Sequence, residues 1–457
     1  MAENILIPIY DLTQKTSRYS CRRILEHTQY LSREGINQLQ NDNLRALIRH
    51  AYQTVPYYNR EFKERRLRPD DIAKVEDLRK LPVLTKDDIR RNFEDLISRD
   101  FPINRLIPYR TGGTGSPLRF FVTKSKISWE VAAEYRAYSW AGYKFGDRCF
   151  MFWGSPIDLS MRISQHERIL RKIARSFERI VVVDPWVLSE TVLEKFAYML
   201  RNFKPRIIRG YAGPVYIMAR YLLENKIYDV RPKAVITSAE TLYKSMRTVI
   251  ENAFGSPVFD YYGSREAGAI ASECEEHSGY HISAENHVLE FVKEGENVSH
   301  DETGEILITG LRNYGMPLIR YQIGDVGKPS NEFCACGRGL PLMKSIEGRA
   351  SQLFRVLDKS SGKIIPLDAS VLMDYLIIHL KSNLEGFRII QESLDRVVVQ
   401  VVKREGRLTN DSSFLIEQLG KYLGGEVQII VEEVDFLPPL PSGKRSPLIS
   451  KIDDFSQ

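Results

Sequence analysis

The segment Tyr109-Arg-Thr-Gly-Gly-Thr-Gly-Ser-Pro-Leu-Arg-Phe120 organises our interpretation of the whole chain. Glycine adopts backbone dihedral angles that are closed to other residues and leaves successive N–H groups uncovered, so this loop can wrap around an anion. The loop has neither the Gly-Lys-Ser/Thr ending of a Walker loop nor the Gly-x-Gly-x-x-Gly spacing of a dinucleotide site. By itself it indicates either a phosphate-binding loop or a plain glycine hairpin that Pro117 ends.

Four further motifs follow this loop along the chain, and the set resembles a known family. They are Tyr261-Tyr-Gly-Ser-Arg-Glu266, Arg320-Tyr-Gln-Ile-Gly-Asp325, Ile346-Glu-Gly-Arg349 and Ser442-Gly-Lys444. With the glycine loop they resemble the ordered core motifs of the adenylate-forming superfamily, which includes acyl-CoA synthetases, luciferases and adenylation domains of peptide synthetases. The resemblance covers roughly residues 40 to 450. Five motifs in the right order are far more specific than any one of them.

Three shorter segments narrow the resemblance to the phenylacetate-CoA ligase branch, including its relatives from capsular-polysaccharide gene clusters. They are Val55-Pro-Tyr-Tyr58, Leu81-Pro-Val-Leu-Thr-Lys-Asp-Asp-Ile-Arg90 and Cys334-Ala-Cys-Gly-Arg-Gly-Leu-Pro341. The resemblance implies an α/β fold, in which a large N-terminal domain of several subdomains with parallel-rich sheets precedes a small, mobile α+β domain.

Length and composition describe an ordinary folded protein. A chain of 457 residues is too long for one simple core, and 43% hydrophobic residues with 27% charged residues argue against disorder. The net charge of +6 comes without a dense basic block, so we expect no nucleic-acid partner. The N-terminus shows no signal-peptide pattern, and no apolar run reaches the roughly 20 residues of a membrane span, which predicts a cytoplasmic protein.

Hydrophobic periodicity predicts the order of the elements. Residues 1 to about 100 are mostly helical, with Thr85 as the N-cap of a helix that runs to about Leu96. Strands and helices then alternate, which predicts a mostly parallel sheet covered on both faces, with ligands at the carboxyl ends of its strands. We expect strands near 149–153, 179–183, 206–210 and 234–240, and helices near 125–142, 189–203 and 215–223.

We place the domain boundary after Gly348. Residues 1–348 form the large ATP- and acyl-binding domain, and residues 349–457 form the small C-terminal α+β domain. In the small domain we expect helices near 369–382 and 411–423 and strands near 397–402 and 427–431. The aspartates that serve the superfamily as a swivel are replaced by Ala350-Ser-Gln352, although a hinge needs only positions that tolerate a dihedral change.

The resemblance implies a ligase that uses ATP to convert a small-molecule carboxylic acid into acyl-AMP, releases pyrophosphate and passes the acyl group to coenzyme A. An alternative is another acceptor, such as a separate acyl-carrier protein, an amine or a sugar. A degenerate nucleotide-binding homologue is a third reading, and a homodimer is left open. Because the attacking carboxylate is already ionised, the enzyme must supply alignment and charge neutralisation rather than a general base.

The resemblance also assigns the site residues. Lys444, Glu266 and Arg349 are the catalytic residues: Lys444 contacts the α-phosphate and the carboxylate, Glu266 holds Mg²⁺, and Arg349 reaches the phosphate or ribose. Asp325 accepts hydrogen bonds from both ribose hydroxyls. The glycine loop, in which Ser116 replaces a common lysine, binds the β- and γ-phosphates. The other nucleotide contacts come from the loop and from two strand ends: Thr111, Gly112, Gly113, Thr114 and Gly115, then Ser238, Ala239, Glu240, Tyr261, Tyr262, Gly263 and Ser264.

A second group of residues suits a metal. Cys274, Cys334 and Cys336 with one histidine make a Cys₃His set typical of tetrahedral zinc, and a Cys-x-Cys pair does not easily bridge to itself. Spacing alone selects His277, whereas the aromatic-His-Ile pattern that recurs in the family selects His281. We expect His281 to be the ligand of a structural zinc, with His277 as the alternative. Buried cysteines without a metal are the competing reading.

Overall fold

The computed structural model describes residues 3–111, 118–154, 179–185, 190–349, 354–357, 364–367, 376, 384–403, 411–423, 427–438 and 447–452. Several predictions of the sequence fall outside this part of the chain. They concern the loop residues Gly112, Gly113, Thr114 and Gly115, the swivel segment 350–352, residue 189 at the start of the helix expected near 189–203, almost all of the helix near 369–382, and Lys444.

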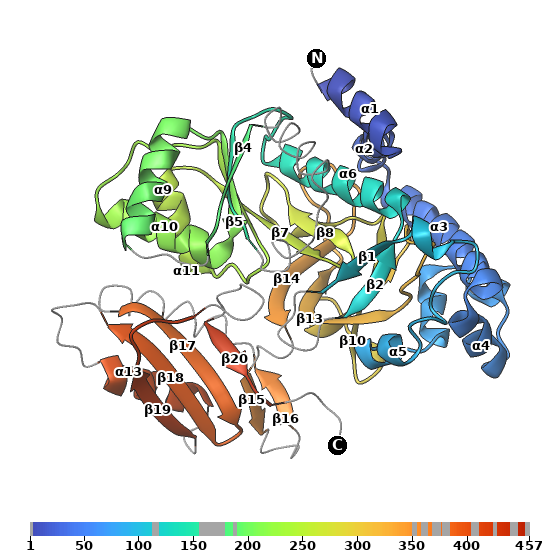
Figure 1. Cartoon of the computed structure of the whole chain (residues 1–457). Coiled ribbons are helices and arrows are strands. Elements are labelled where there is room, and N and C mark those ends of the chain that lie inside the picture. The colour runs from blue at the N-terminus through green and yellow to red at the C-terminus, as the bar shows by residue number, and fades with distance from the viewer. Residues whose placement is uncertain are drawn as a thin grey trace.

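The chain begins with a helical region that packs on one end of the large sheet (Figure 1). Its helices are α1 (Glu3–Gln14), α2 (Arg18–Thr28), α3 (Arg33–Thr54), α4 (Pro56–Glu64) and α5 (Lys86–Arg91). Val55 has the extended backbone that a following proline favours, and it separates α3 from α4. Thr85 and Asp88 form a capping box at the start of α5.

Helix α5 ends at Arg91, so the predicted extension to about Leu96 is wrong. Asn92 ends the helix because its side chain bonds to two groups outside the regular helical pattern. The Nδ2 group donates to the Asp88 carbonyl at 2.9 Å, and Arg60 donates to its Oδ1 at 2.8 Å. An asparagine side chain that bonds locally competes with the helical backbone, which is how such residues end helices.

The large sheet is mixed. Within the described residues its twelve strands lie in the order β11-β10-β12-β13-β14-β9-β8-β7-β6-β5-β3-β4. The strands are β3 (Cys149–Phe152), β4 (Ile180–Val183), β5 (Ile207–Tyr211), β6 (Ala234–Ser238), β7 (Val258–Ser264), β8 (Gly268–Glu273), β9 (Tyr280–Ile282), β10 (His287–Lys293), β11 (Glu296–Asn297), β12 (Gly304–Gly310), β13 (Tyr321–Ser330) and β14 (Leu342–Arg349).

The parallel prediction holds for one half of this sheet. Strands β4, β3, β5, β6 and β7 pair in parallel, and helices separate most of them in the sequence. After β7 the strands follow one another without helices and pair antiparallel, because short connections reverse the chain direction. The junction between the two halves therefore lies at β7.

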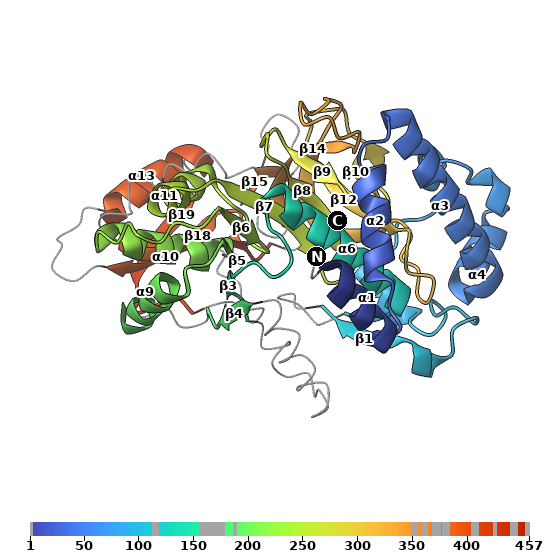
Figure 2. The ribbon, with the colours of Figure 1, turned by 90° about the horizontal axis from the view of Figure 1, so that it is seen from above.

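Helices cover both faces of the parallel half (Figures 1 and 2). One face carries α9 (Glu190–Phe203), α10 (Ala212–Glu224) and α11 (Lys244–Phe254), which pack with Phe150, Ile208 and Val235. The other face carries α6 (Lys124–Trp140), whose Tyr138 packs with Ile207 and Phe259. Neighbouring strand residues thus alternate between two cores, as the pleat requires. Helix α10 begins at Ala212, ahead of the predicted start, since Pro214 is tolerated in a first turn.

A buried ion pair anchors α6 to the rest of the large sheet. Arg136 donates to the two carboxylate oxygens of Glu285 at 2.6 and 3.1 Å, and Thr28 of α2 donates to the same carboxylate at 2.7 Å. Both charged side chains are 1% exposed. The two short strands β1 (Ile107–Arg110) and β2 (Arg119–Val122) flank the glycine loop and lead into α6.

The C-terminal segment forms a smaller four-stranded sheet in the order β19-β18-β17-β20, with α13 packed on it. Its elements are β17 (Leu384–Ser393), β18 (Arg396–Lys403), α13 (Asp411–Leu423), β19 (Gln428–Glu433) and β20 (Leu448–Ser450). The sequence did not predict β17 or the ribbon β15 (Phe354–Leu357) with β16 (Ile364–Leu367). Phe387 of β17 packs near Ala212 and Met246, so this sheet contacts α10 and α11. No helix in the described part of the chain is both long and apolar enough to cross a bilayer.

Candidate functional site

The carboxyl end of β6 lies beside the middle of β7, which continues to Ser264. Ser238 pairs with Tyr261 across the two strands, and Tyr211 of β5 pairs with Ser238. Ala239 follows in the left-handed region at φ 67°, a conformation that costs a non-glycine residue on the order of 1–3 kcal/mol. The Glu240 carboxylate accepts a hydrogen bond from the Gly213 N–H at 2.7 Å, at the start of α10. The predicted corner is therefore strained and held in place.

Two reciprocal hydrogen bonds join the end of β7 to β13. Tyr262 donates its hydroxyl to Asp325 at 2.8 Å, and Tyr321 donates its hydroxyl to Glu266 at 3.1 Å. Each strand thus supplies one tyrosine and each tyrosine reaches a carboxylate from the other motif. We call these four residues the carboxylate corner. Glu266 and Asp325, 59 residues apart by their numbers, are brought into one connected group.

Arg349 joins this group through the backbone. It pairs with Asp325 across strands β14 and β13, at the end of the antiparallel run. Asp325 is 8% exposed, so its carboxylate is largely enclosed. The sequence motif that supplied Asp325 also contains Tyr321, whose contact with Glu266 sequence reasoning missed. Its place four residues before Asp325 in the quoted motif was the available signal.

Gly263 and Ser264 serve the turn between β7 and β8. A Cβ atom at Gly263 would lie 2.8 Å from the Gly268 carbonyl oxygen, so the close approach of the two strands requires glycine there. Ser264 accepts a hydrogen bond on Oγ from the Ala267 N–H at 3.1 Å. These contacts set the direction in which the chain leaves β7 and therefore the place of Glu266.

Thr111 and Leu118 close the base of the glycine loop. The Thr111 N–H donates to the Leu118 carbonyl at 2.9 Å, and the Leu118 N–H donates to Oγ1 of Thr111 at 2.9 Å. The base is therefore the end of the hairpin that β1 and β2 form, which is compatible with both interpretations of the loop. The six residues between them lie outside the described part, so their contacts stay a prediction.

The structure gathers Cys274, His281, Cys334 and Cys336 into one cluster, the cysteine–histidine cluster. One ligand atom from each residue lies within 4.8 Å of all the others. The Sγ atoms of Cys274 and Cys334 are 3.6 Å apart, and Cys336 Sγ lies 3.3 Å from Nε2 of His281. A disulfide needs about 2.05 Å, whereas ligands about 2.3 Å from a tetrahedral zinc lie somewhat less than 4 Å from one another. The donor set and the spacing both fit zinc.

His281 and His277 have different surroundings. Desolvation, followed by the nearby Arg338, lowers the pKa of His281 to about 4, which leaves the neutral imidazole that binds metals. His277 instead lies beside Glu273, with Nδ1 3.4 Å from the carboxylate, and its ring is 4.7 Å from that of Phe259. His277 is not among the residues of the cluster.

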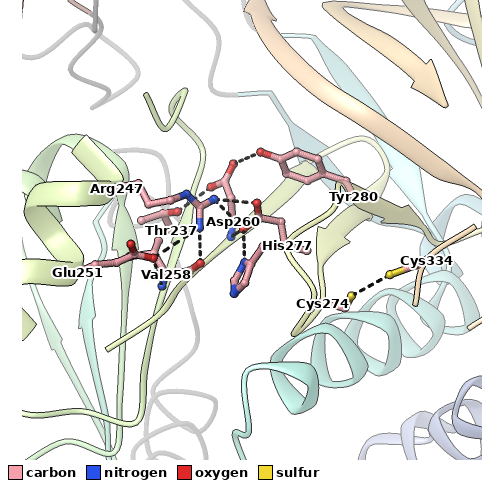
Figure 3. A network of polar contacts seen from close by, with 10 residues as sticks. Thr237, Arg247, Glu251, Val258, Asp260, Cys274, His277, Tyr280 and Cys334 are labelled. Carbon is pink, nitrogen blue, oxygen red and sulfur yellow. Dashed lines mark hydrogen bonds and ion pairs between the residues drawn. The ribbon is translucent and has the colours of Figure 1, made fainter. Parts of the chain in front are cut away.

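A polar network lies next to this cluster, between α11 and strands β6 to β9 (Figure 3). Arg247 donates to both carboxylate oxygens of Glu273, the residue before Cys274, at 2.7 and 2.8 Å. Asp260 accepts hydrogen bonds from Thr237 at 2.7 Å and from Tyr280 at 2.8 Å. Burial, and then the negative charge of Glu273, raise the pKa of Asp260 to about 6.

Comparison with known proteins gives a consistent picture. The CapK C-terminal domain family matches residues 359–451. The chain is similar to Protein CapK of Staphylococcus aureus, with 25% identity over 455 residues that cover 98% of this chain and 97% of that protein. It is also similar to a phenylacetate-coenzyme A ligase of Escherichia coli, with 27% identity over 403 residues that cover 84% of this chain and 86% of the ligase.

A solved structure shares the fold. The crystal structure of a 2-hydroxyisobutyryl-CoA ligase in the postadenylation state, in complex with an acyl-AMP, superposes with a TM-score of 0.72 at 19% identity. The match covers 94% of this chain and 92% of the ligase chain. The large mixed sheet with a smaller C-terminal sheet is thus the fold of an adenylate-forming enzyme.

Proposed function

We propose that this protein is an AMP-forming ligase. The reason is that the chain belongs to the adenylate-forming superfamily, in the branch of phenylacetate-CoA ligases and CapK. It activates a carboxylic acid with ATP as acyl-AMP, releases pyrophosphate and transfers the acyl group to coenzyme A. The observation that carries the proposal is the carboxylate corner. In it, the two acidic residues expected at the nucleotide each accept a hydrogen bond from a tyrosine of the other motif, near the carboxyl end of a parallel strand.

Each acidic residue of the corner has a distinct task. Asp325 accepts hydrogen bonds from the two ribose hydroxyls, and its tyrosine partner holds the carboxylate in one orientation. Glu266 offers carboxylate oxygens suited to Mg²⁺, which neutralises charge on the phosphate oxygens. Tyr321 orients Glu266, since a hydroxyl on one oxygen leaves the other for the metal.

The remaining roles are assigned from the motifs. The glycine loop presents backbone N–H groups to the β- and γ-phosphates, and Lys444 neutralises charge at the α-phosphate while the carboxylate attacks in line. The strained corner at Ala239 and the ring of Tyr262 border the adenine. The cysteine–histidine cluster binds one structural zinc, which ties β8 and β9 to the segment after β13.

A second candidate differs in the acyl acceptor. CapK, whose own C-terminal domain family matches residues 359–451, covers more of this chain than the phenylacetate-CoA ligase does. The alternative is an adenylating enzyme that transfers the acyl group to a carrier protein, an amine or a sugar. Both candidates share the first half-reaction.

Exchange of labelled pyrophosphate into ATP tests the shared step. Aryl, fatty and amino acids are each supplied to the purified protein, with and without coenzyme A. We expect exchange that depends on the acid, and consumption of coenzyme A only with the acids that support exchange. Absence of exchange with every acid would count against the ligase. Exchange without consumption of coenzyme A would select the alternative acceptor.

A further inference from the structure

Four residues of α6 form a buried polar stripe. Lys126, Glu130, Glu134 and Tyr138 recur every four residues and therefore share one face of the helix. Their side chains are largely enclosed: Lys126 is 7% exposed, Glu130 16% and Glu134 35%. Arg209 of β5, whose side chain is 14% exposed, faces the stripe. We call Arg209 and the four residues of α6 together the α6 stripe.

The charges of the stripe are paired within it. Lys126 forms an ion pair with Glu130. Arg209 donates to Glu134 at 2.8 Å, lies 3.7 Å above the ring of Tyr138, and also bonds to the hydroxyl of that tyrosine. Two cations therefore balance two carboxylates, and the net charge of the stripe is zero.

The stripe runs alongside the site. At one end a Cβ atom on Gly268 would lie 2.5 Å from the Glu130 side chain, so the backbone two residues after Glu266 packs directly against the stripe. At the other end the ring of Tyr138 lies 5.6 Å from that of Tyr261, which pairs with Ser238 at the end of β6. The stripe thus spans from the residue assigned to Mg²⁺ to the strand end assigned to the nucleotide.

A small cavity with a mostly apolar lining lies at the Glu266 end. Lys126, Glu130 and Glu266 line it, and its volume of about 30 Å³ has room for roughly two water-sized groups. Asn286 and Asn313 line it too, and they are 2% and 5% exposed. Within the described part of the chain their Oδ1 atoms have no hydrogen-bond partner. Buried acceptors of this kind are costly unless a donor reaches them.

Stability does not account for this arrangement. A buried ion pair contributes about as much as the desolvation of its charges costs, and apolar residues of similar size would serve the packing at least as well. Ala132, Ala133 and Ala137 are buried on the same helix. A further buried charge of α6, Arg136, pairs with Glu285 beside α2, whereas the stripe faces β5 and β7.

We propose that the α6 stripe contacts the acyl part of the substrate and selects a carboxylic acid that carries hydroxyl groups. This inference rests on the proposed ligase function and names the substrate class for the same site. A hydroxyl both donates and accepts, so it can bond to the paired charges without adding a charge that nothing balances. A purely apolar acyl chain would exclude water from the partly exposed carboxylate of Glu134 without offering it a further hydrogen bond.

Stable analogues of the acyl-adenylate test the inference without requiring turnover. Acyl-sulfamoyl adenosines are prepared in matched pairs that differ only by a hydroxyl or a methyl group on the acyl part, and calorimetry measures their Kd. We expect the hydroxylated member to bind more tightly by at least about tenfold, as sites that bond to a substrate hydroxyl discriminate against analogues without it. Equal or tighter binding of the methyl member overturns the inference.

Substitutions in the α6 stripe test whether its residues cause the preference for the hydroxylated analogue. Arg209→Met combined with Glu134→Leu removes both charges together, so no buried charge is left unpaired, and should reduce the preference to within about twofold. Tyr138→Phe removes a single hydroxyl and should reduce the preference for the hydroxylated analogue partly. This variant tests the inference if the double variant fails to fold. The matched control replaces an exposed pair, Arg201→Met with Asp229→Leu, and should keep the full preference. An unchanged preference in Tyr138→Phe and in a folded double variant overturns the assignment.

A binding measurement distinguishes failure of the proposed ligase function from failure of the inference about the substrate class. Sulfamoyl adenosine without an acyl part should bind to the wild-type protein, since it uses only the nucleotide contacts. Absence of binding by this compound and by every acylated analogue rejects the ligase and the inference with it. Binding of the nucleotide part without acyl discrimination rejects the inference alone.

Discussion

The carboxylate corner and the cysteine–histidine cluster both connect the region of β7 to β9 with the region of β13 and beyond. They differ in whether their polar atoms bond in pairs or converge on one centre. In the corner a tyrosine hydroxyl bonds to one carboxylate of each motif. In the cluster four ligand atoms surround one centre within 4.8 Å of one another. A substrate site must stay open, whereas a structural metal site is closed. Substitutions should therefore separate the two by what they change, catalysis or stability.

The largest effect is expected at the substrate site. Lys444→Ala should lower the rate of pyrophosphate exchange by about 100-fold to 1,000-fold, because it removes a cation from the phosphate where charge develops. The affinity for ATP, measured by calorimetry, should change little. Lys451→Ala is the control, since that lysine pairs with Glu392 at an exposed position. Near-normal exchange in Lys444→Ala would remove this lysine from the mechanism.

The cluster should respond in the opposite sense. Metal analysis should find about one zinc per chain, and Cys336→Ser should lose it and lower the free energy of unfolding by on the order of 3 kcal/mol. Exchange per folded molecule should stay within about twofold. Cys21→Ser serves as the control, because Cys21 is a buried free cysteine outside the cluster. A metal-free wild-type protein of full stability would contradict the zinc assignment.

The polar network beside the cluster predicts a pH dependence. The pKa of Asp260 is raised from 3.8 to about 6, first by burial and then by Glu273, so the folded protein holds this proton more tightly than the unfolded chain does. Its contribution is therefore greatest below pH about 4 and is lost as the pH rises to about 6, by on the order of 3 kcal/mol.

The variant Asp260→Asn isolates this contribution, because other carboxylates titrate with the opposite sign. Subtracting its urea-unfolding free energies from those of the wild type should give a difference that falls between pH 4 and 6 and is flat above. A difference that rises with pH over that range would show that the sign is wrong.

The smallest effects on the kinetics should distinguish the tasks of the two carboxylates in the carboxylate corner. Tyr262→Phe and Tyr321→Phe each remove one hydrogen bond, which is worth about 1 kcal/mol, or roughly fivefold in a rate or binding constant. Tyr262→Phe should raise the KM for ATP, since Asp325 serves the ribose. Tyr321→Phe should lower kcat and raise the Mg²⁺ concentration needed for half-maximal rate. Identical kinetic changes in both variants would argue against separate tasks for the two carboxylates.

Sequence reasoning succeeded where chemistry is local in the chain. The strand that ends at Ser238 was predicted from a short apolar run followed by small polar residues, and the cap at Thr85 was predicted from the residues themselves. It failed where a distant partner decides. Asn92 ends α5 through a contact with Arg60, and β17 forms between β18 and β20, whose registers no local pattern records.

The sequence by itself determined the family, the alternation of strands and helices, and the residue types that suit nucleotide and metal, because motif spacing and periodicity are properties of the chain. Only the tertiary structure decided that Tyr321 donates a hydrogen bond to Glu266 and that the ring of His277 lies beside the carboxylate of Glu273. It also decided that Arg209 of β5 bonds to Glu134 of α6. Such pairs depend on the packing of elements far apart in the chain. A distance of about 3 Å between two side chains follows from that packing, and no local preference encodes it.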